Sequence, residues 1–339
     1  MAASIAESTV PPEKRTGLGV LHWVLAIGVA AVLLYKALHG VDWARVWQTV
    51  LAARWPYLVL GMLISTGSFV LRAVRWRILL NAEAAEPLTV PAVFRANMAG
   101  YLGNNILPAR AGEVIRSMIV SGHSSLTRAY VLTTALSERM VDAIALVLWG
   151  SVTLWSVPQK PAWMVPVART MALGAVAGTL ALIVLPHMKG LAQAVIRRMP
   201  GPPALKEKLA GMLEQILLGV RAFHNLGRFL GFAFLTALIW TVDACTMMVS
   251  GHALRLEMPF PAAVLLLTAM GLGSALPSTP GYVGIYQFAA VTVLAAFGIG
   301  RDEALAFSLV TQAFGYVVIA ILGVPGLYGS LSLWRGRRS

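Results

Sequence analysis

The chain has 339 residues, of which 58% are hydrophobic and only 12% are charged, whereas soluble globular proteins have roughly 45–50% apolar and about 25% charged residues. Its net charge is +13, from 27 Lys and Arg against 14 Asp and Glu. This composition excludes an aqueous globular enzyme. It predicts an all-α polytopic membrane protein, because the apolar runs continue for about 20 residues and do not alternate as in a membrane barrel.

The positive charge does not require a nucleic-acid partner, because cytoplasmic loops of membrane proteins collect Lys and Arg next to anionic lipid. No nucleic-acid binding is therefore expected. The single cysteine, Cys245, excludes a disulfide within the chain and a cysteine-based metal site. The six histidines show no metal-ligand spacing, so the sequence predicts neither a metal nor a cofactor.

Six segments are apolar over about 20 residues, the length that a membrane-spanning helix requires. In chain order they are Val20–Leu38, Pro56–Leu80, Tyr130–Trp155, Val165–Met188, Leu226–His252 and Ala304–Leu331. A polar cytosolic tail of residues 1–18 comes first and lacks the features of a cleaved signal peptide. A basic cytosolic tail of residues 335–339 comes last. The expected membrane halves are residues 19–188 and 226–334.

A long polar stretch, residues 189–225, separates the two halves. In it the helix breaker Pro200-Gly201-Pro202-Pro203 is followed by charged residues and leucines at helical spacing. We predict a basic amphipathic helix that lies at the cytoplasmic surface. Its expected role is an elbow that joins the halves, with specific lipid sensing as the alternative.

Two apolar segments, residues 91–121 and 261–298, are interrupted by Gly, Pro and polar residues and resemble each other. In each, Leu-Gly is followed by Leu-Pro and, four residues after that Pro, by Gly; these residues are Pro108 with Gly112 and Pro277 with Gly281. The match predicts an internal duplication. Broken backbone at membrane depth survives only inside protein or beside a wet cavity. We therefore predict two re-entrant helical hairpins, with kinked spanning helices as the alternative.

The distribution of basic residues predicts that both termini lie in the cytosol of a bacterial inner membrane. With this orientation, most Lys and Arg outside the spans fall on the cytoplasmic side. The spans that lead into the two hairpins then run in opposite directions, and the hairpins enter from opposite faces. Such an inverted repeat is typical of transporters that bind substrate near the membrane midplane, between broken helices.

Two groups of charged residues stand at membrane depth in the first half. One flanks the tip of the first hairpin and the other lies inside the third spanning segment. An ionised side chain at the bilayer centre costs at least about 2.5–3.5 kcal/mol, so it normally pairs or lines a polar cavity. The expected ion pairs are Arg110 and Arg116 with Glu138 and Asp142, and Glu113 with Arg139.

This cluster has two interpretations. It holds the first hairpin in place, or it leaves one or more arginines able to bind an anionic headgroup, because guanidinium binds phosphate oxygens bidentately. Asp243 stands alone in the fifth segment and is either the partner of a nearby arginine or a proton-coupling carboxylate. The run Arg75-Trp76-Arg77 at the end of the second segment indicates an interfacial anchor.

The tip of the second hairpin carries no charge and offers hydroxyl, amide and backbone N–H groups. Its polar side chains are Ser278, Thr279, Tyr282, Tyr286 and Gln287. The predicted structural turns of the two hairpins are made by Pro108, Gly112, Pro277, Pro280 and Gly284. We expect the two tips to approach each other and to bind one lipid jointly, with the positive charge supplied by the first tip alone. This asymmetry favours a headgroup with a single negative charge.

These motifs resemble the flippase-like, lysylphosphatidylglycerol-synthase transmembrane-domain family. The resemblance covers nearly the whole chain and rests on Arg75-Trp76, Pro108-x-Arg110-x-Gly112-Glu113-x-x-Arg116, Glu138-Arg139-x-x-Asp142 and Pro277-x-x-Pro280-Gly281-x-x-Gly284. The family often has Glu where this chain has Gln287. The resemblance implies lipid movement: phospholipid flipping in the lysyl-lipid synthases, and lipid export in hopanoid-associated members. The separate soluble domain that carries lysyl transfer in the synthases is not expected here.

The predicted function is therefore a lipid translocase or exporter that moves an anionic or amphipathic membrane lipid, and not an enzyme. The residues predicted to bind substrate are Asn104, Asn105, Arg110, Glu113, Arg116, Glu138, Arg139, Asp142, Ser278, Thr279, Gly281, Tyr282, Tyr286 and Gln287, with Asp243 as a coupling residue. The alternatives are a non-transporting accessory subunit of a lipid-modifying system and an intramembrane lipid-linked transferase. A homo-oligomer or a partner in lipid biosynthesis is compatible with each.

Overall fold

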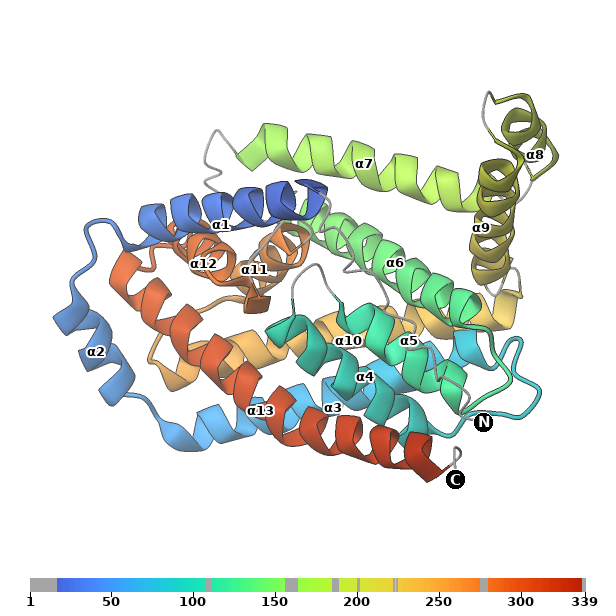
Figure 1. Ribbon diagram of the computed structural model, residues 1–339. Coiled ribbons are helices and arrows are strands. Elements are labelled where there is room, and N and C mark those ends of the chain that lie inside the picture. The colour runs from blue at the N-terminus through green and yellow to red at the C-terminus, as the bar shows by residue number, and fades with distance from the viewer. Residues whose placement is uncertain are drawn as a thin grey trace, which may run out of the picture.

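A computed structural model describes residues 17–107, 111–155, 164–184, 189–199, 202–221, 223, 225–274 and 280–336, and every regular element in these ranges is a helix (Figure 1). The helices are α1 (Gly17–Leu38), α2 (Trp43–Leu51), α3 (Trp55–Leu80), α4 (Val90–Ile106), α5 (Gly112–Gly122), α6 (Arg128–Trp155), α7 (Met164–Val184), α8 (Lys189–Arg198), α9 (Pro203–Arg221), α10 (Leu226–Ala253), α11 (Phe260–Gly273), the short η2 (Pro280–Tyr282), α12 (Ile285–Ala295) and α13 (Arg301–Gly336).

Each of the six predicted spanning segments forms a helix: α1, α3, α6, α7, α10 and α13. Three stretches are long and apolar enough to cross a membrane: Trp55–Leu80, Leu226–Ala253 and Arg301–Tyr328. A fourth crossing would combine α1 with α2, which meet at 84°. The described part of the chain thus has three or four candidate spans, which makes it a multi-pass membrane protein. This number is below the predicted six partly because α6 carries three charged residues, Glu138, Arg139 and Asp142, in its apolar stretch.

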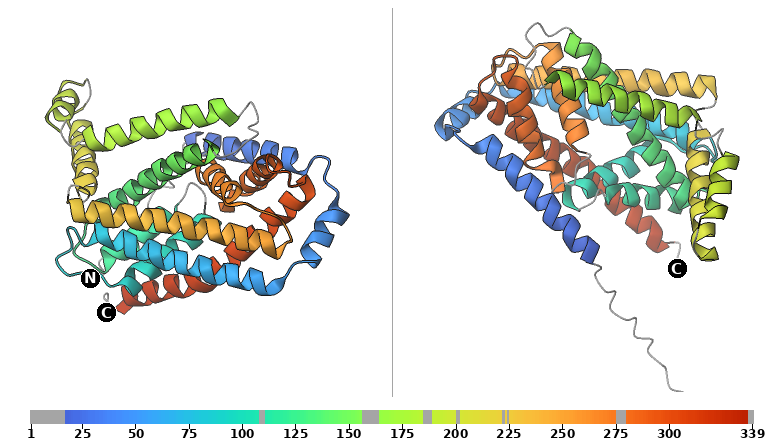
Figure 2. Two further views of the ribbon diagram at one scale, coloured as in Figure 1. Left: turned by 180° about the vertical axis from the view of Figure 1, so that it is seen from behind. Right: turned by 90° about the horizontal axis from the view of Figure 1, so that it is seen from above.

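The two halves of the chain meet along α3 and α10, which lie side by side and run antiparallel (Figures 1 and 2). At one end the Arg54 N–H donates to the Ala253 carbonyl oxygen at 2.8 Å. At the other end Gly231 faces the Ile78 side chain. The last turns of α3 therefore lie against the first turns of α10.

Both segments predicted as hairpins are pairs of helices joined at a break. In the first, α4 packs against α5; in the second, α11 packs against α12, and η2 lies between them. The second pair also reaches the first, because η2 packs against α4. The tips themselves, residues 108–110 and 275–279, lie outside the described residues, so their approach stays a prediction.

Helix neighbours repeat between the halves. Helix α6 packs on α11 of the second pair, and α13 packs on α4 of the first. Both crossings are close, because a Cβ atom added at Gly150 would lie 2.8 Å from Thr268, and one added at Gly323 would lie 2.7 Å from the Met98 carbonyl oxygen. Small residues allow such close approach of helices in membranes. The two broken pairs are thus held from both sides by long helices.

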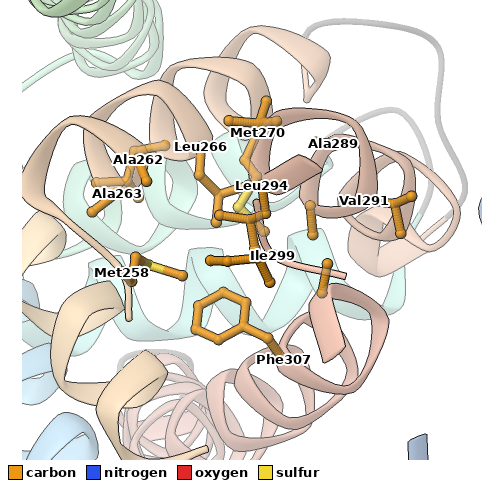
Figure 3. Packing of buried hydrophobic residues seen from close by; sticks show 14 of the residues in the cluster. Met258, Ala262, Ala263, Leu266, Met270, Ala289, Val291, Leu294, Ile299 and Phe307 are labelled. Atoms are coloured by element: carbon orange, nitrogen blue, oxygen red, sulfur yellow. The ribbon is translucent and has the colours of Figure 1, made fainter. Parts of the chain in front are cut away.

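The second broken pair is embedded in an apolar core (Figure 3). Leu266 of α11, Leu294 of α12 and Phe307 of α13 each have no exposed surface. Dispersion contacts of this kind accumulate to a large stabilisation, although each atom pair contributes only about 0.1–0.2 kcal/mol. The core fixes where the second break lies relative to α13.

The polar stretch between the halves forms two helices, α8 and α9, rather than the single predicted one. Helix α9 begins at Pro203, which suits the first turn of a helix because proline lacks the N–H that would stay unpaired there. The Lys206 ammonium donates to the Arg197 carbonyl oxygen at 3.0 Å and links the two helices.

Candidate functional site

A cavity of about 750 Å³ lies between the two broken helix pairs. Its wall is formed by α3, α4, α5, α6, α10, α11, α12, α13 and η2. One part is apolar, with Leu58, Met247 and Phe314 among its residues. The polar part consists of Ser65, Ser68, Arg72, Tyr101, Asn104, Asn105, Glu113, Arg139, Asp142, Trp240, Asp243, Thr246, Ser250, Ser274, Tyr282, Tyr286, Thr311, Gln312 and Tyr316. Such a mixed wall suits an amphipathic ligand.

Six charged residues behind and along this wall form one chain of ion pairs in which the sign alternates. Its order is Asp142, Arg75, Glu138, Arg116, Glu113 and Arg139, with successive N–O distances of 2.6, 2.7, 2.9, 2.5 and 2.8 Å. The chain ties α3, α5 and α6 together. Every charge in it has an opposite neighbour, which is the arrangement that makes ionised groups tolerable away from water.

The middle of the chain is buried. The side chains of Arg75 and Arg116 are 0% and 1% exposed, and that of Glu138 is 2% exposed. The Arg116 guanidinium lies over the Trp76 ring at 4.4 Å and also donates to the Asn97 side-chain oxygen at 2.9 Å. None of these five residues lies on the cavity wall. They form a support that fixes the position of the wall.

Arg139 ends the chain and faces the cavity. Its Nε donates to Glu113 Oε1 at 2.9 Å, and its Nη2 lies 2.8 Å from the same oxygen. Its side chain is 30% exposed, and its guanidinium lies 5.7 Å from the centre of the Tyr101 ring. Among the described residues around the cavity, four arginines are in ion pairs. The side chain of Arg139 has the largest exposed fraction of the four, so it offers the most surface to a ligand.

A separate ion pair joins Arg72 of α3 to Asp243 of α10. Ser68 donates to the other oxygen of the Asp243 carboxylate at 2.6 Å, and the Trp240 ring lies 5.0 Å from the Arg72 guanidinium. Both charged residues lie on the cavity wall. Of the two interpretations of Asp243, the structure thus shows the arginine partner, which is Arg72, and a coupling role stays a prediction.

The second break is held by neutral groups. The Gly284 N–H donates to Gln287 Oε1 at 2.7 Å, and Gln287 Nε2 donates to Gln312 Oε1 at 2.5 Å. Gln312 Nε2 and the Tyr316 hydroxyl both donate to the Gly281 carbonyl oxygen, at 2.7 and 2.5 Å. Gly281 has φ 71°, which glycine adopts without a steric penalty. These bonds fix the turn that presents Tyr282 to the cavity.

The predicted ion pairs are correct in part. Arg116 pairs with Glu138, and Glu113 pairs with Arg139, as expected. Asp142 does not pair with Arg116 but with Arg75. The interpretation of Arg75 as an interfacial anchor is wrong, because Arg75 lies at the centre of the buried network. The sequence contained a signal for this role, since Arg72 and Arg75 lie within an apolar segment that continues to Leu79 and Leu80.

The structure distributes the predicted binding residues over three settings. On the cavity wall lie Asn104, Asn105, Glu113, Arg139, Asp142, Asp243, Gly281, Tyr282 and Tyr286. Buried away from the wall lie Arg116, Glu138 and Gln287. Outside the described residues lie Arg110, Ser278 and Thr279, together with the predicted turn residues Pro108 and Pro277. Arg116 and Glu138 therefore do not reach a ligand directly in this arrangement, and Gln287 holds the second turn.

Glycines at the breaks serve packing as well as turning. Gly112 is the first residue of α5 and lies against α4. A Cβ atom added there would overlap the Gly100 carbonyl oxygen and the Asn104 side chain. Gly284, with φ 90°, lies against the backbone of Ala30 in α1. In the residues that the structure describes, no group of three His, Cys, Asp or Glu side chains could hold a metal ion.

Comparison with known proteins identifies relatives along most of the chain. A UPF0104 membrane protein of Methanothermobacter thermautotrophicus is 25% identical over 300 residues, which cover 83% of this chain and 85% of that protein. A second UPF0104 membrane protein of the same archaeon is 24% identical over 294 residues, which cover 79% and 82%. Glycosyltransferase AglD of Haloferax volcanii is 25% identical over 296 residues, which cover 77% of this chain but only 46% of AglD.

Residues 23–323 match the family described as the lysylphosphatidylglycerol synthase TM region. This range contains both broken helix pairs, the whole chain of ion pairs and the Arg72–Asp243 pair. The chain therefore belongs to the lysylphosphatidylglycerol synthase TM region family.

Proposed function

We propose that this protein is a lipid translocase or exporter that moves an anionic or amphipathic lipid across or out of a bacterial inner membrane. The observation that carries the proposal is the 750 Å³ cavity, which lies between two broken helix pairs and combines paired charges with an apolar wall. Irregular backbone at membrane depth is tolerated where it lines such a cavity. The family resemblance to lipid-moving proteins agrees with this function.

The headgroup would occupy the charged part of the cavity, with Arg139 as its first contact. Arg139 is the most exposed of the paired arginines, and its planar guanidinium suits a phosphate. Tyr282 and Tyr286, whose rings stack at 5.4 Å, would contact the headgroup from the other half. The apolar wall would accept the start of the acyl chains.

The proposed membrane arrangement is an inverted repeat of about six spans and two re-entrant hairpins, with both termini in the cytosol. Its support is the repeated pattern of helix neighbours. Helix α6 packs on α11 as α13 packs on α4, and the central helices α3 and α10 run antiparallel. In transporters with this architecture, the substrate site alternates between the two sides as one repeat rocks against the other. Energy would come from a gradient or from removal of the product.

The test is translocation in liposomes by the purified full-length protein. A phospholipid that carries a fluorophore on an acyl chain is incorporated in both leaflets, and its exposure to a membrane-impermeant quencher is followed over time. We expect the wild type to move this lipid faster than empty liposomes do. We expect Arg139→Gln to slow it by about tenfold or more, because a charged hydrogen bond contributes about 1.5–3 kcal/mol.

The matched control is Arg45→Gln, since Arg45 is exposed on α2 and does not lie on the cavity wall. Its rate should equal that of the wild type. Equal rates for wild-type and empty liposomes would contradict the proposed function.

A second candidate is an intramembrane transferase that acts on a lipid-linked substrate. The match to a protein named glycosyltransferase AglD favours it, although the match covers 46% of that protein. Under this alternative, the cavity would hold the lipid-linked substrate while the transfer takes place. Mass spectrometry of lipids incubated with the purified protein distinguishes the two, because a transferase changes the mass of the lipid and a translocase does not. If the protein purified alone neither moves nor modifies lipid, and does so only with a co-purifying protein, the chain would instead be an accessory subunit.

A further inference from the structure

We propose that Arg72 and Asp243 form an exchangeable anion site on the cavity wall. A proton taken up by the Asp243 carboxylate releases the Arg72 guanidinium, which then binds a headgroup phosphate. The inference rests on the proposed lipid function and adds two features to it: the residue that binds the phosphate after its first contact with Arg139, and the event that loads and unloads it.

The pair stands apart from the chain of ion pairs and is held by fewer bonds. Glu113 and Glu138 are each shared by two arginines. Asp142 accepts two hydrogen bonds from Arg75, at 2.6 and 2.9 Å. Asp243, in contrast, is held by one Arg72 nitrogen and the Ser68 hydroxyl. Among these four carboxylates, Asp243 is therefore the one that accepts the fewest bonds from arginine, one against at least two for each of the others.

The pair is also accessible from the cavity. The side chains of Arg72 and Asp243 are 11% and 16% exposed, whereas those of Arg75 and Glu138 are 0% and 2% exposed. A proton and a phosphate can thus reach both partners through the same cavity. The Trp240 ring, 5.0 Å from the Arg72 guanidinium, would hold that group at the wall after the carboxylate is neutralised.

Other polar and charged groups act on Arg72 from neighbouring helices. They are Tyr101 of α4, Asp142 of α6 and Arg75 of α3. Gln312 and Tyr316 of α13 line the same cavity. Asp142 is already neutralised by its two bonds to Arg75. The charge that decides the state of Arg72 is therefore that of Asp243.

The exchange keeps the buried charge balanced. A proton from the bulk solvent reaches an oxygen of Asp243 through the cavity, and the carboxyl group becomes neutral and keeps its hydrogen bond to Ser68. The N–H groups that faced the carboxylate then donate to a phosphate oxygen. One anion thus replaces another beside Arg72. No charge is left unpaired, which matters because an unpaired charge at a buried site costs about 3–5 kcal/mol. Loss of the proton reverses the steps and expels the headgroup.

The experiment measures proton uptake on lipid binding. The purified full-length protein in detergent is titrated with short-chain phosphatidylglycerol, whose phosphodiester does not titrate near neutral pH, in two buffers of different ionisation enthalpy. For the wild type we expect close to one proton taken up per lipid bound. Affinity should rise by up to about tenfold for each unit that the pH falls.

Three variants separate the roles. Asp243→Asn imitates the protonated state and should bind this lipid without proton uptake and independently of pH. Arg72→Gln should bind it at least about tenfold more weakly, since it removes a charged hydrogen bond. The double variant Arg72→Gln with Asp243→Asn restores charge balance and should fold, but it should lack proton-linked binding. Glu257→Gln, an exposed carboxylate away from the cavity, should behave as the wild type.

The proposal is overturned if the wild type binds the lipid without proton uptake. It is also overturned if the double variant keeps proton-linked lipid binding. Inorganic phosphate titrated alone separates the two sources of phosphate: proton-linked binding of free phosphate would overturn the assignment of the ligand as a lipid headgroup. Translocation in liposomes without proton-linked binding would refute this inference alone. Absence of translocation with intact proton-linked binding would refute the proposed function alone.

Discussion

The two broken helix pairs have the same plan and are held by different chemistry. The break between α4 and α5 is followed by Glu113 and Arg116, which belong to a chain of six charges. The break between α11 and α12 is held by two glutamines and a tyrosine hydroxyl that bind backbone groups. A match in glycine and proline positions therefore predicts where a chain turns, while the side chains around the turn decide how firmly it is held.

This difference bears on which pair can move. Separating an ion pair in a site with little water costs several kcal/mol, whereas a neutral hydrogen bond contributes about 0.5–1.5 kcal/mol. The first pair is bound to α6 through the ion pairs of Glu113 and Arg116, and the second is bound to α13 through amides and a hydroxyl. We expect the second pair to shift first when the cavity opens.

The largest effect is expected when the chain of charges is interrupted. Glu138→Gln leaves Arg75 and Arg116 facing each other with one carboxylate fewer, and should lower the free energy of unfolding by about 3–5 kcal/mol. The double variant with Arg116→Gln should lose less than the sum of the two single losses. Thermal unfolding of detergent-purified protein measures both, with the exposed Glu86→Gln as control. Strictly additive losses would mean that the two residues do not interact.

An intermediate effect is expected at the first break. Gly112→Ala places a methyl group onto the Gly100 carbonyl and the Asn104 side chain, which forces α4 and α5 apart. We expect a loss of about 1–3 kcal/mol, as for other overpacked sites, and slower lipid movement, because Glu113 shifts with α5. The matched control is Gly174→Ala in α7, where nothing lies within 4 Å of the added atom. It should be neutral or stabilise the protein by up to about 1 kcal/mol. Equal stability of the two variants would contradict the close packing of the first pair.

The smallest effect is expected at the second break. Tyr316→Phe removes one of the two groups that donate to the Gly281 carbonyl oxygen, while Gln312 keeps its own bond to that oxygen. We expect a loss of about 0.5–1.5 kcal/mol, together with faster amide hydrogen exchange in η2 and the first turn of α12. Unchanged exchange there would show that the hydroxyl does not hold the turn.

The sequence predicted the two broken pairs because Gly and Pro act locally. Breaks in the backbone follow from the residue types at the break itself, as at Gly112 and Gly281. The six long helices followed from apolar length in the same way. The nine-residue α2 was not predicted, since Trp43–Leu51 is too short to be a span.

The candidate site was harder to predict because its partners are distant in sequence. Arg75 lies 67 residues from Asp142 and 63 from Glu138, and Arg72 lies 171 from Asp243. An arginine near the end of an apolar segment has the pattern of an interfacial anchor, and only the packing of α3 against α6 and α10 shows otherwise. Arg116 and Arg139 differ little in sequence context, yet one is buried and the other lines the cavity.

The Arg72 and Arg75 pairings also constrain how the chain enters the membrane. Helix α3 is synthesised before α6 and α10, which carry the carboxylates for its two arginines. Until those helices emerge from the ribosome, each unpaired arginine opposes insertion of α3 by about 2.5–3.5 kcal/mol. The pairing of both arginines therefore follows the synthesis of these later helices. It is complete only after Asp243 has been made, when more than two thirds of the chain has been synthesised.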